Sequence, residues 1–461
     1  MSAALPHLSF PPEPPPIDVP GSTTMTTHHH RRAMRLAVTG LAVAALSACA
    51  GTGSVPADDA GDATTTSGSV DSVTVWSNHP GESKPVEEEL NAAFEEETGI
   101  SVNLVTAGAS YEEVAQRFNA ALAGGDLPDV VVVSDVTWFN FALTDAITPM
   151  DELWEEGDVD SEGYVDSLRE DYVFEDAHYA LPYSRSTPLF YYNRDMWEAA
   201  GLPDRGPETW AEFAEWAPQL AAANPGMAPM VLPDGSNYLD WYFQGMIWTF
   251  GGAYSDEWEP TFTSPESIEA GQFLQDQVEQ GHIAISNDAN NQFGAGQAAS
   301  LLQSTGSLGG LSETAAFDFG TAFLPGPRPG TPTGGAGLAI AEGIDDARKA
   351  AAMEYIAFVT NTDNTVTFSQ ATGYMPVRKD AVDHEDTQAY LEENPNFRTA
   401  LEQLEVTAPQ DAMRVFLPGG GARIGAALDR ITTGGEDVET VFGELAEESR
   451  TVFERDIEPQ L

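Results

Sequence analysis

Cysteine and basic side chains are both scarce in this sequence of 461 residues. The single cysteine, Cys49, excludes a disulfide within one chain and a zinc site built from cysteines. Only 20 Lys and Arg stand against 73 Asp and Glu, which gives a formal net charge of -53. So negative a chain is repelled by nucleic acid and by anionic lipid surfaces, and we expect neither as a partner.

The sequence also lacks the spacings that mark common catalytic and metal sites. The few histidines have no HExxH spacing, no GxSxG forms a nucleophile elbow, and no Walker or GxGxxG frame fits. We therefore expect no catalytic residues, no metal and no cofactor. A carboxylate pair for glycoside hydrolysis could still lie among the 73 acids, which keeps an exported α/β hydrolase as an alternative function.

The first 71 residues are typical of an export signal followed by a tether. A basic stretch at 30–35 precedes an apolar run at 36–46 that is too short for an ordinary membrane span. The tetrapeptide LSAC at 46–49 resembles the bacterial lipobox, in which the cysteine is lipidated. We expect residues 1–49 to be a signal peptide with lipobox, Cys49 to carry the lipid, and residues 50–71 to be a flexible tether. The protein would then be exported and anchored at the outer face of the cytoplasmic membrane.

From residue 73 onward, strand-like and helix-like patterns alternate. Apolar stripes at Val86, Leu90 and Phe94, and then at Val114, Phe118 and Leu122, predict two helices that end at glycines. Strands are expected at 73–77, 101–105 and 129–133. This βαβαβ order predicts an α/β layer with a mostly parallel sheet. Ligands on such sheets gather at the carboxyl ends of the strands, here 76–81, 107–111 and 134–138.

A second α/β unit is expected to begin near Ser186. A strand at 189–192 is followed by a long helix that opens at Trp210 and by helical segments over 238–281. Strand signals return at 317–324 and 337–341, and the remainder is largely helical up to 437–455.

Several loops combine small, aromatic or basic residues in ways that suit a ligand. Gly/Ser-rich turns at 304–310 and 334–337 allow backbone N–H groups to converge on an anion or on sugar hydroxyls. Arg414 and Arg423 flank a glycine-rich loop, and such scarce arginines are expected to pair with something specific.

Eight stretches of the sequence, in the same order, resemble the bacterial extracellular solute-binding proteins of the maltose-binding type. They include "TVWSNHPGE", "SRSTPLFYYNRDMWEAAGLP", "STGSLGGL" and "TGYMPVRKDA", and together they span nearly all of residues 73–435. The similarity is greatest to members that bind sn-glycerol-3-phosphate or a glycerophosphodiester. The resemblance implies a two-lobed periplasmic-binding-protein-like (type II) α/β fold with a hinge. Lobe 1 would comprise 72–184 and 323–360, and lobe 2 would comprise 185–322 and 361–461.

The resemblance also implies a ligand site and partners. The implied contacts are Tyr111, Asp135 for glycerol hydroxyls, Trp210 near the glycerol, Ser186, Ser304 and Gly335 around the phosphate, Tyr374 on the phosphate side, and Arg414 or, second, Arg423 on the phosphate. The sequence departs from the family pattern at Asp135, where Glu is usual, and at Arg185, where an uncharged residue is usual; an extra arginine favours an anion. A monomer that delivers a small polar solute to two permease subunits and an ATPase of an ABC importer is expected. A neutral, maltose- or trehalose-like oligosaccharide is the alternative ligand.

Overall fold

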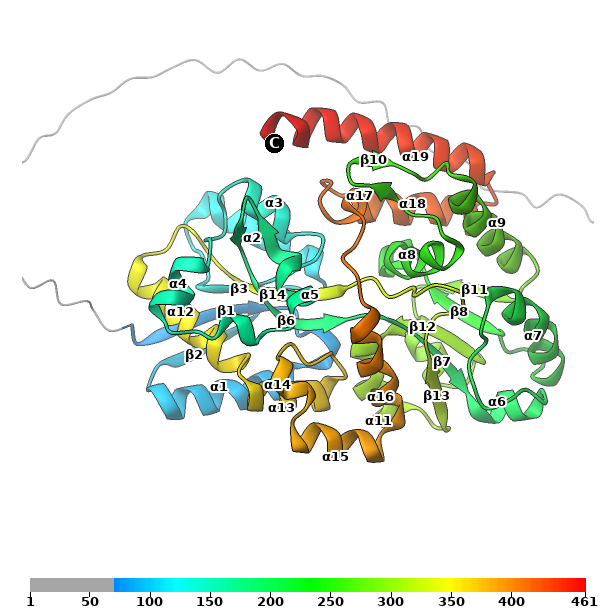
Figure 1. Cartoon of the computed structure of the whole chain (residues 1–461), viewed down its shortest axis with the longest axis horizontal. Coiled ribbons are helices and arrows are strands. Elements are labelled where there is room, and N and C mark those ends of the chain that lie inside the picture. The colour runs from blue at the N-terminus through cyan, green and yellow to red at the C-terminus, as the bar shows by residue number, and fades with distance from the viewer. Residues whose placement is uncertain (1–69) are drawn as a thin grey trace, which may run out of the picture. The chain divides into compact units, whose positions relative to one another are not determined.

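The computed structural model describes residues 70–461 and contains two five-stranded sheets (Figure 1). The expected signal peptide, Cys49 and nearly all of the expected tether lie outside the described residues. Within 70–461, no helix is both long enough and apolar enough to cross a membrane.

The first sheet contains the βαβαβ unit that the sequence pattern predicts. Its strand order is β2–β1–β3–β14–β6. The strand bounds are β1 Ser72–Ser77, β2 Ser101–Thr106, β3 Val130–Ser134, β6 Leu181–Ser186 and β14 Gly334–Ile340. Strand β1 pairs in parallel with β2 and β3, whereas β14 runs antiparallel to both β3 and β6. The predicted parallel unit is confirmed, and the complete sheet is mixed.

The second sheet has the order β11–β8–β12–β7–β13. Its strands are β7 Pro188–Asn193, β8 Met230–Pro233, β11 Ile283–Ser286, β12 Ser300–Ser304 and β13 Phe319–Ala322. Two short ribbons stand apart from the sheets, β4 Val173–Phe174 with β5 Ala177–His178, and β9 Ser255–Asp256 with β10 Glu259–Pro260. Residues far apart in the sequence therefore build each sheet.

Helices cover both sheets (Figure 1). Up to β6 the chain forms α1 Lys84–Thr98, α2 Tyr111–Gly124, α3 Trp138–Leu143, α4 Asp151–Glu156 and α5 Asp166–Arg169. Between β7 and β14 it forms α6 Arg194–Ala199, α7 Trp210–Ala223, α8 Leu239–Phe250, α9 Pro265–Glu279, α10 Ala289–Gly294 and α11 Leu308–Thr314. After β14 follow α12 Asp346–Val359, α13 Thr362–Thr372, α14 Lys379–Val382, α15 Glu385–Glu393, α16 Pro395–Glu402, α17 Ala412–Val415, α18 Gly420–Thr432 and α19 Val438–Val452. Single turns of helix, among them η3 Glu170–Tyr172, η4 Gly235–Asn237 and η5 Thr305–Ser307, shape the loops.

Local signals explain the ends of the first helices. Gly99 and Gly125 close α1 and α2 in the left-handed conformation that glycine adopts without a Cβ clash. The side chain of Ser110 caps α2 by accepting from the Glu113 N–H. Leu122, expected on the buried stripe, is 38% exposed; the buried residues of α2 are Val114 and Phe118.

The two sheets are joined by segments that cross from one to the other. Only Thr187 separates β6 of the first sheet from β7 of the second. Residues 331–333 and 406–408 run side by side, since the Thr333 N–H donates to the Ala408 carbonyl at 2.9 Å and the Ala408 N–H donates to the Thr331 carbonyl at 3.1 Å. The Gln403 amide also donates to the Thr187 hydroxyl at 2.7 Å. The crossing segments thus form one bonded bundle.

Arg378 and Lys379 lie with the first sheet, although the sequence-based division places 361–461 in the second lobe. Arg378 pairs with Asp160 at 2.8 Å, and Lys379 pairs with Asp166 at 2.8 Å. These ion pairs attach the start of α14 to the first layer before the chain crosses back, whereas α13 contacts both α1 and α11.

Candidate ligand-binding site

A cavity of about 360 Å³ opens where loops from both sheets face each other. The first sheet contributes the turns after β1, β2 and β3, which carry His79, Tyr111 and Asp135, as well as Ser186 and Gly335 from the ends of β6 and β14. The second sheet contributes η4, the start of α8 and the turn after β12. The predicted position of a site, at the carboxyl ends of the first parallel strands, is therefore where the cavity lies.

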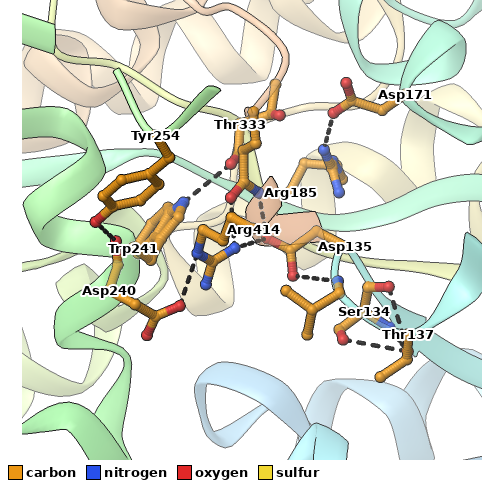
Figure 2. Close-up of polar contacts among 12 residues, drawn as sticks. Ser134, Asp135, Thr137, Asp171, Arg185, Asp240, Trp241, Tyr254, Thr333 and Arg414 are labelled. Carbon is orange, nitrogen blue, oxygen red and sulfur yellow. Dashed lines mark hydrogen bonds and ion pairs between the residues drawn. The ribbon is translucent and has the colours of Figure 1, made fainter. Parts of the chain in front are cut away.

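Arg414 on α17 is the only guanidinium among the residues that line this cavity. It is 2% exposed, and its Nε donates to Asp240 Oδ2 at 2.7 Å (Figure 2). Its Nη1 donates to Asp135 Oδ2 at 3.0 Å and also to the Gln410 side chain. One buried positive charge thus faces two carboxylates, one in the turn after β3 and one on α8.

Asp240 differs from an ordinary aspartate because it is buried. Burial raises the pKa of Asp240 to about 6, and Arg414 only partly opposes this rise. Arg414 thus has two carboxylate partners for one positive charge. A bound anion can replace one of them while the other continues to hold the guanidinium in place.

Two buried polar atoms of residues that line the cavity have no hydrogen-bond partner within the described chain. They are the hydroxyl of Tyr111 and Oδ1 of Asn78. Burial raises the pKa of Tyr111 to about 12, so its hydroxyl is protonated and able to donate. Because buried polar groups are nearly always paired, these atoms indicate that a polar molecule completes the site.

Two glycines are required by the way the cavity wall is packed. Gly335 has φ +91°, and a Cβ there would lie 1.9 Å from the Ser184 carbonyl oxygen. The carbonyl of Gly335 accepts from the Asp135 N–H at 3.1 Å, which fixes the turn after β3. At Gly306 a Cβ would lie 2.6 Å from the ring of Tyr374, so this turn accommodates the aromatic side chain only as glycine.

Aromatic side chains of α8 form much of the remaining wall. Trp241 packs against Gly334, where a Cβ would lie 2.3 Å from the indole, and its Nε1 donates to the Thr333 carbonyl at 2.9 Å. Tyr242 donates to Gln303, and the Tyr238 hydroxyl donates to Glu112 at 3.0 Å across the two sheets. From the sequence, none of these three aromatic side chains was assigned to a ligand site.

The structure places seven of the nine sequence-derived contact residues together in this cavity: Tyr111, Asp135, Ser186, Ser304, Gly335, Tyr374 and Arg414. Trp210 lies elsewhere, buried at the start of α7, and its Nε1 donates to Thr249 at 2.8 Å. Arg423 lies on a surface depression beside α19, where it pairs with Glu448 at 2.8 Å.

Arg185, the unusual arginine of the β6 crossing, does not line the main cavity. It is completely buried and donates to the Tyr172 hydroxyl at 2.7 Å. It also pairs with Asp171, as Figure 2 shows. Its charge is therefore matched by one carboxylate. Within residues 70–461, no three His, Cys, Asp or Glu side chains group as ligands for a metal ion.

Comparison with known proteins supports the same reading of the fold. The family model of the bacterial extracellular solute-binding proteins matches residues 89–399. The crystal structure of UgpB from Mycobacterium tuberculosis in complex with glycerophosphocholine is 48% identical and has a TM-score of 0.82; it covers 85% of this chain and 100% of that one. The sn-glycerol-3-phosphate-binding periplasmic protein UgpB of Escherichia coli (strain K12) is 25% identical over 396 residues, which are 81% of this chain and 88% of the relative.

More distant structures share the fold. Maltose-bound MalE3 of T. maritima is 22% identical with a TM-score of 0.72, and it covers 83% of this chain and 99% of that one. The two-lobed type II architecture expected from the sequence is thereby confirmed. With a family match over most of its described length and a 48% identical relative, this chain belongs to the bacterial extracellular solute-binding proteins.

Proposed function

We propose that this protein is the substrate-binding component of an ABC importer and that it captures a glycerophosphodiester between its two lobes. The observation that carries the proposal is Arg414, the one buried guanidinium in a cavity that also offers unpartnered polar atoms. The 48% identical relative, a UgpB solved with glycerophosphocholine, supports this choice of ligand.

The arrangement suits a phosphodiester, which carries one negative charge. The phosphate would accept from Arg414 and from the hydroxyls of Tyr111 and Ser304, while Asp135 would accept from a glycerol hydroxyl. The proposed contact set is Tyr111, Asp135, Ser186, Ser304, Gly335, Tyr374 and Arg414, with Trp241 in the place that the family resemblance gave to Trp210. Trp241 would pack against the carbon face of the ligand.

The proposed lobes are the layers of the two sheets, which would close on the ligand by bending at the crossing segments. Lobe 1 would comprise 72–184, 323–360 and also the segment up to Lys379, since its ion pairs attach it there. Lobe 2 would comprise 185–322 and the remainder of the chain. No catalytic step is proposed.

The proposed location is the outer face of the cytoplasmic membrane, where a lipid on Cys49 would hold the protein as a monomer beside its permease. The test is whether removal of Cys49 releases the protein from the membrane fraction. A Cys49→Ala variant should appear in the soluble extracellular or periplasmic fraction, and an unchanged membrane fraction would contradict lipid anchoring.

Two other ligands are alternatives to the phosphodiester. sn-Glycerol-3-phosphate shares the phosphate but carries up to one more negative charge at neutral pH. A neutral oligosaccharide would use the aromatic wall and leave Arg414 without an anion. Isothermal titration of the purified chain with glycerophosphocholine, sn-glycerol-3-phosphate and maltose separates them. Saturable binding of the phosphodiester supports the proposal; binding of maltose alone would overturn it while leaving a solute-binding protein.

A further inference from the structure

A second, smaller cavity of about 80 Å³ lies on the other side of Asp135. Asp135 lines both cavities, and its carboxylate accepts from the Gln410 amide, which also lines the second one. The Asp135–Gln410 contact is thus the partition between the two spaces. The family resemblance assigned no residue to this second cavity apart from Asp135.

The wall of the second cavity contains a buried donor that has no acceptor. Arg185 uses Nη1 and Nη2 on Tyr172 and Asp171, but its Nε has no hydrogen-bond partner within the described residues. An unpaired N–H of a fully buried guanidinium is costly, because such a group loses its hydration without replacement. A hydrogen-bond acceptor is therefore expected in this space.

Carboxylates outnumber cationic side chains on the same wall. Three carboxylates, those of Asp135, Glu170 and Asp171, line the cavity together with the single guanidinium of Arg185. The hydroxyl of Tyr172 accepts from Arg185 and retains its own proton, since burial raises its pKa. A hydroxyl satisfies both sides of this wall, because it accepts from Nε and donates to a carboxylate.

A quaternary ammonium fits the wall less well than a hydroxyl. It has no lone pair for Arg185 Nε and no hydrogen for the carboxylates, and it would lie beside the Arg185 charge. A second phosphate is disfavoured by the three carboxylates.

We propose that the second cavity is a subsite for the hydroxyl-bearing head group of a glycerophosphodiester, such as a second glycerol. The phosphate would remain at Arg414, and the head group would pass Asp135 by displacing Gln410. This proposal rests on the proposed function, because it extends the same ligand from the main cavity. It makes Arg185, Glu170 and Asp171 residues that determine head-group specificity.

The test uses three ligands that share the glycerol phosphate: glycerophosphoglycerol, glycerophosphocholine and sn-glycerol-3-phosphate. We expect the chain to bind glycerophosphoglycerol about tenfold more tightly than glycerophosphocholine in isothermal titration. Val415, which lines the second cavity and is 4% exposed, allows the space to be filled by Val415→Phe. This variant should lose the tenfold preference and leave glycerophosphocholine binding within about twofold. The matched control is Val406→Phe at a position that is 38% exposed, which should retain the preference.

A variant with little risk of misfolding provides the second arm. The side chain of Glu170 is 51% exposed and takes part in surface ion pairs, so Glu170→Gln should leave the melting temperature nearly unchanged. It should weaken glycerophosphoglycerol about threefold and leave glycerophosphocholine unchanged. If folded Val415→Phe or Glu170→Gln protein shifts both diesters equally, or neither, the subsite is refuted and the proposed function stands. If no phosphate ligand binds to the unmodified chain, both proposals fail.

Discussion

Arg414 and Arg185 are two buried arginines on either side of Asp135, and they differ in how their charge is matched. Arg414 contacts two carboxylates, Asp240 at 2.7 Å and Asp135 at 3.0 Å. Arg185 contacts a single carboxylate, Asp171, and completes its bonding with the hydroxyl of Tyr172. Both guanidiniums are almost inaccessible, at 2% and 0% exposure.

The difference shows which arginine is able to exchange partners. A one-to-one buried pair is costly to break, because either charge alone would be uncompensated. Arg414 pairs with two carboxylates, so an arriving phosphate can replace one of them as the acceptor while the other continues to hold the side chain. Arg185 is therefore structural at its Nη atoms and free only at Nε, whereas Arg414 is suited to bind an anion directly.

The largest expected effect is on ligand affinity at Arg414. Arg414→Ala removes the charge that faces the phosphate and should weaken glycerophosphocholine about 100-fold, or ~3 kcal/mol. Arg414→Lys keeps the positive charge but loses the planar, bidentate geometry of the guanidinium, and its affinity should lie between those of the parent and of Arg414→Ala. Arg423→Ala, which lies outside the cavity, is the matched control and should bind within twofold of the parent in isothermal titration. Equal losses at Arg414 and Arg423 would contradict the comparison.

The next effect is on stability at Arg185. Arg185→Met leaves Asp171 buried without its partner and should lower the free energy of unfolding by about 3 kcal/mol in urea denaturation. The double variant Arg185→Met with Asp171→Leu should recover most of this loss, since both charges are removed together. If the double variant is less stable than the single one, the pair is not the isolated unit described above.

The aromatic wall is expected to contribute about tenfold. Trp241→Leu should weaken glycerophosphocholine by that factor, since the indole would pack against the ligand and it donates a hydrogen bond to the Thr333 carbonyl. Trp210→Leu should instead lower the melting temperature and leave affinity nearly unchanged, since its indole is bonded to Thr249 in the core. The reverse assignment of the two effects would restore Trp210 to the site.

The smallest expected effect is a pH dependence set by Asp240. Its pKa of about 6 in the folded chain is above the ordinary 3.8, so its ionised form is destabilising above pH 6, and this cost is relieved as the pH falls from 6 towards 4. A bound phosphate would raise this pKa further, because its negative charge disfavours the ionised carboxylate, and affinity should therefore increase a few-fold from pH 7 to pH 5.

The control for this pH effect is a second buried aspartate. Burial raises the pKa of Asp411 to about 6 as well, but its carboxylate accepts from the Tyr254 N–H and Trp248 and, unlike that of Asp240, forms no ion pair with Arg414. Titrations at several pH values should show a flat profile for Asp240→Asn and an unchanged slope for Asp411→Asn. A slope that survives in Asp240→Asn would assign the effect to another group.

Much of the fold was predictable because its signals are local. The stripes of Val86, Leu90 and Phe94, and the glycines that end α1 and α2, are legible within a few residues of sequence. The turns after β1, β2 and β3 could be placed at one sheet edge because the carboxyl ends of parallel strands meet there. The family resemblance then grouped Arg414 and Tyr374 with these turns, although each of the two residues lies more than 200 positions after the turns in the sequence.

The part that was not predictable depends on contacts distant in sequence or on backbone geometry. Trp241 donates to the carbonyl of Thr333, 92 residues away, whereas Trp210 donates to Thr249 and is buried in the core. The sequence around the two tryptophans does not show which one faces the ligand site. The departure at Arg185 was visible in the sequence, but its partner Asp171 lies in a short helical turn that has no sequence signature. The positive φ of Tyr238, 69°, is likewise invisible to pattern analysis.

The most direct measurement is a crystal structure of the chain with glycerophosphocholine bound. We predict that the phosphate lies within hydrogen-bond distance of the Arg414 guanidinium, that Trp241 packs against the ligand, and that Arg185 remains paired with Asp171. A phosphate bound at Arg423, or a ligand in the main cavity that makes no contact with Arg414, would contradict this prediction.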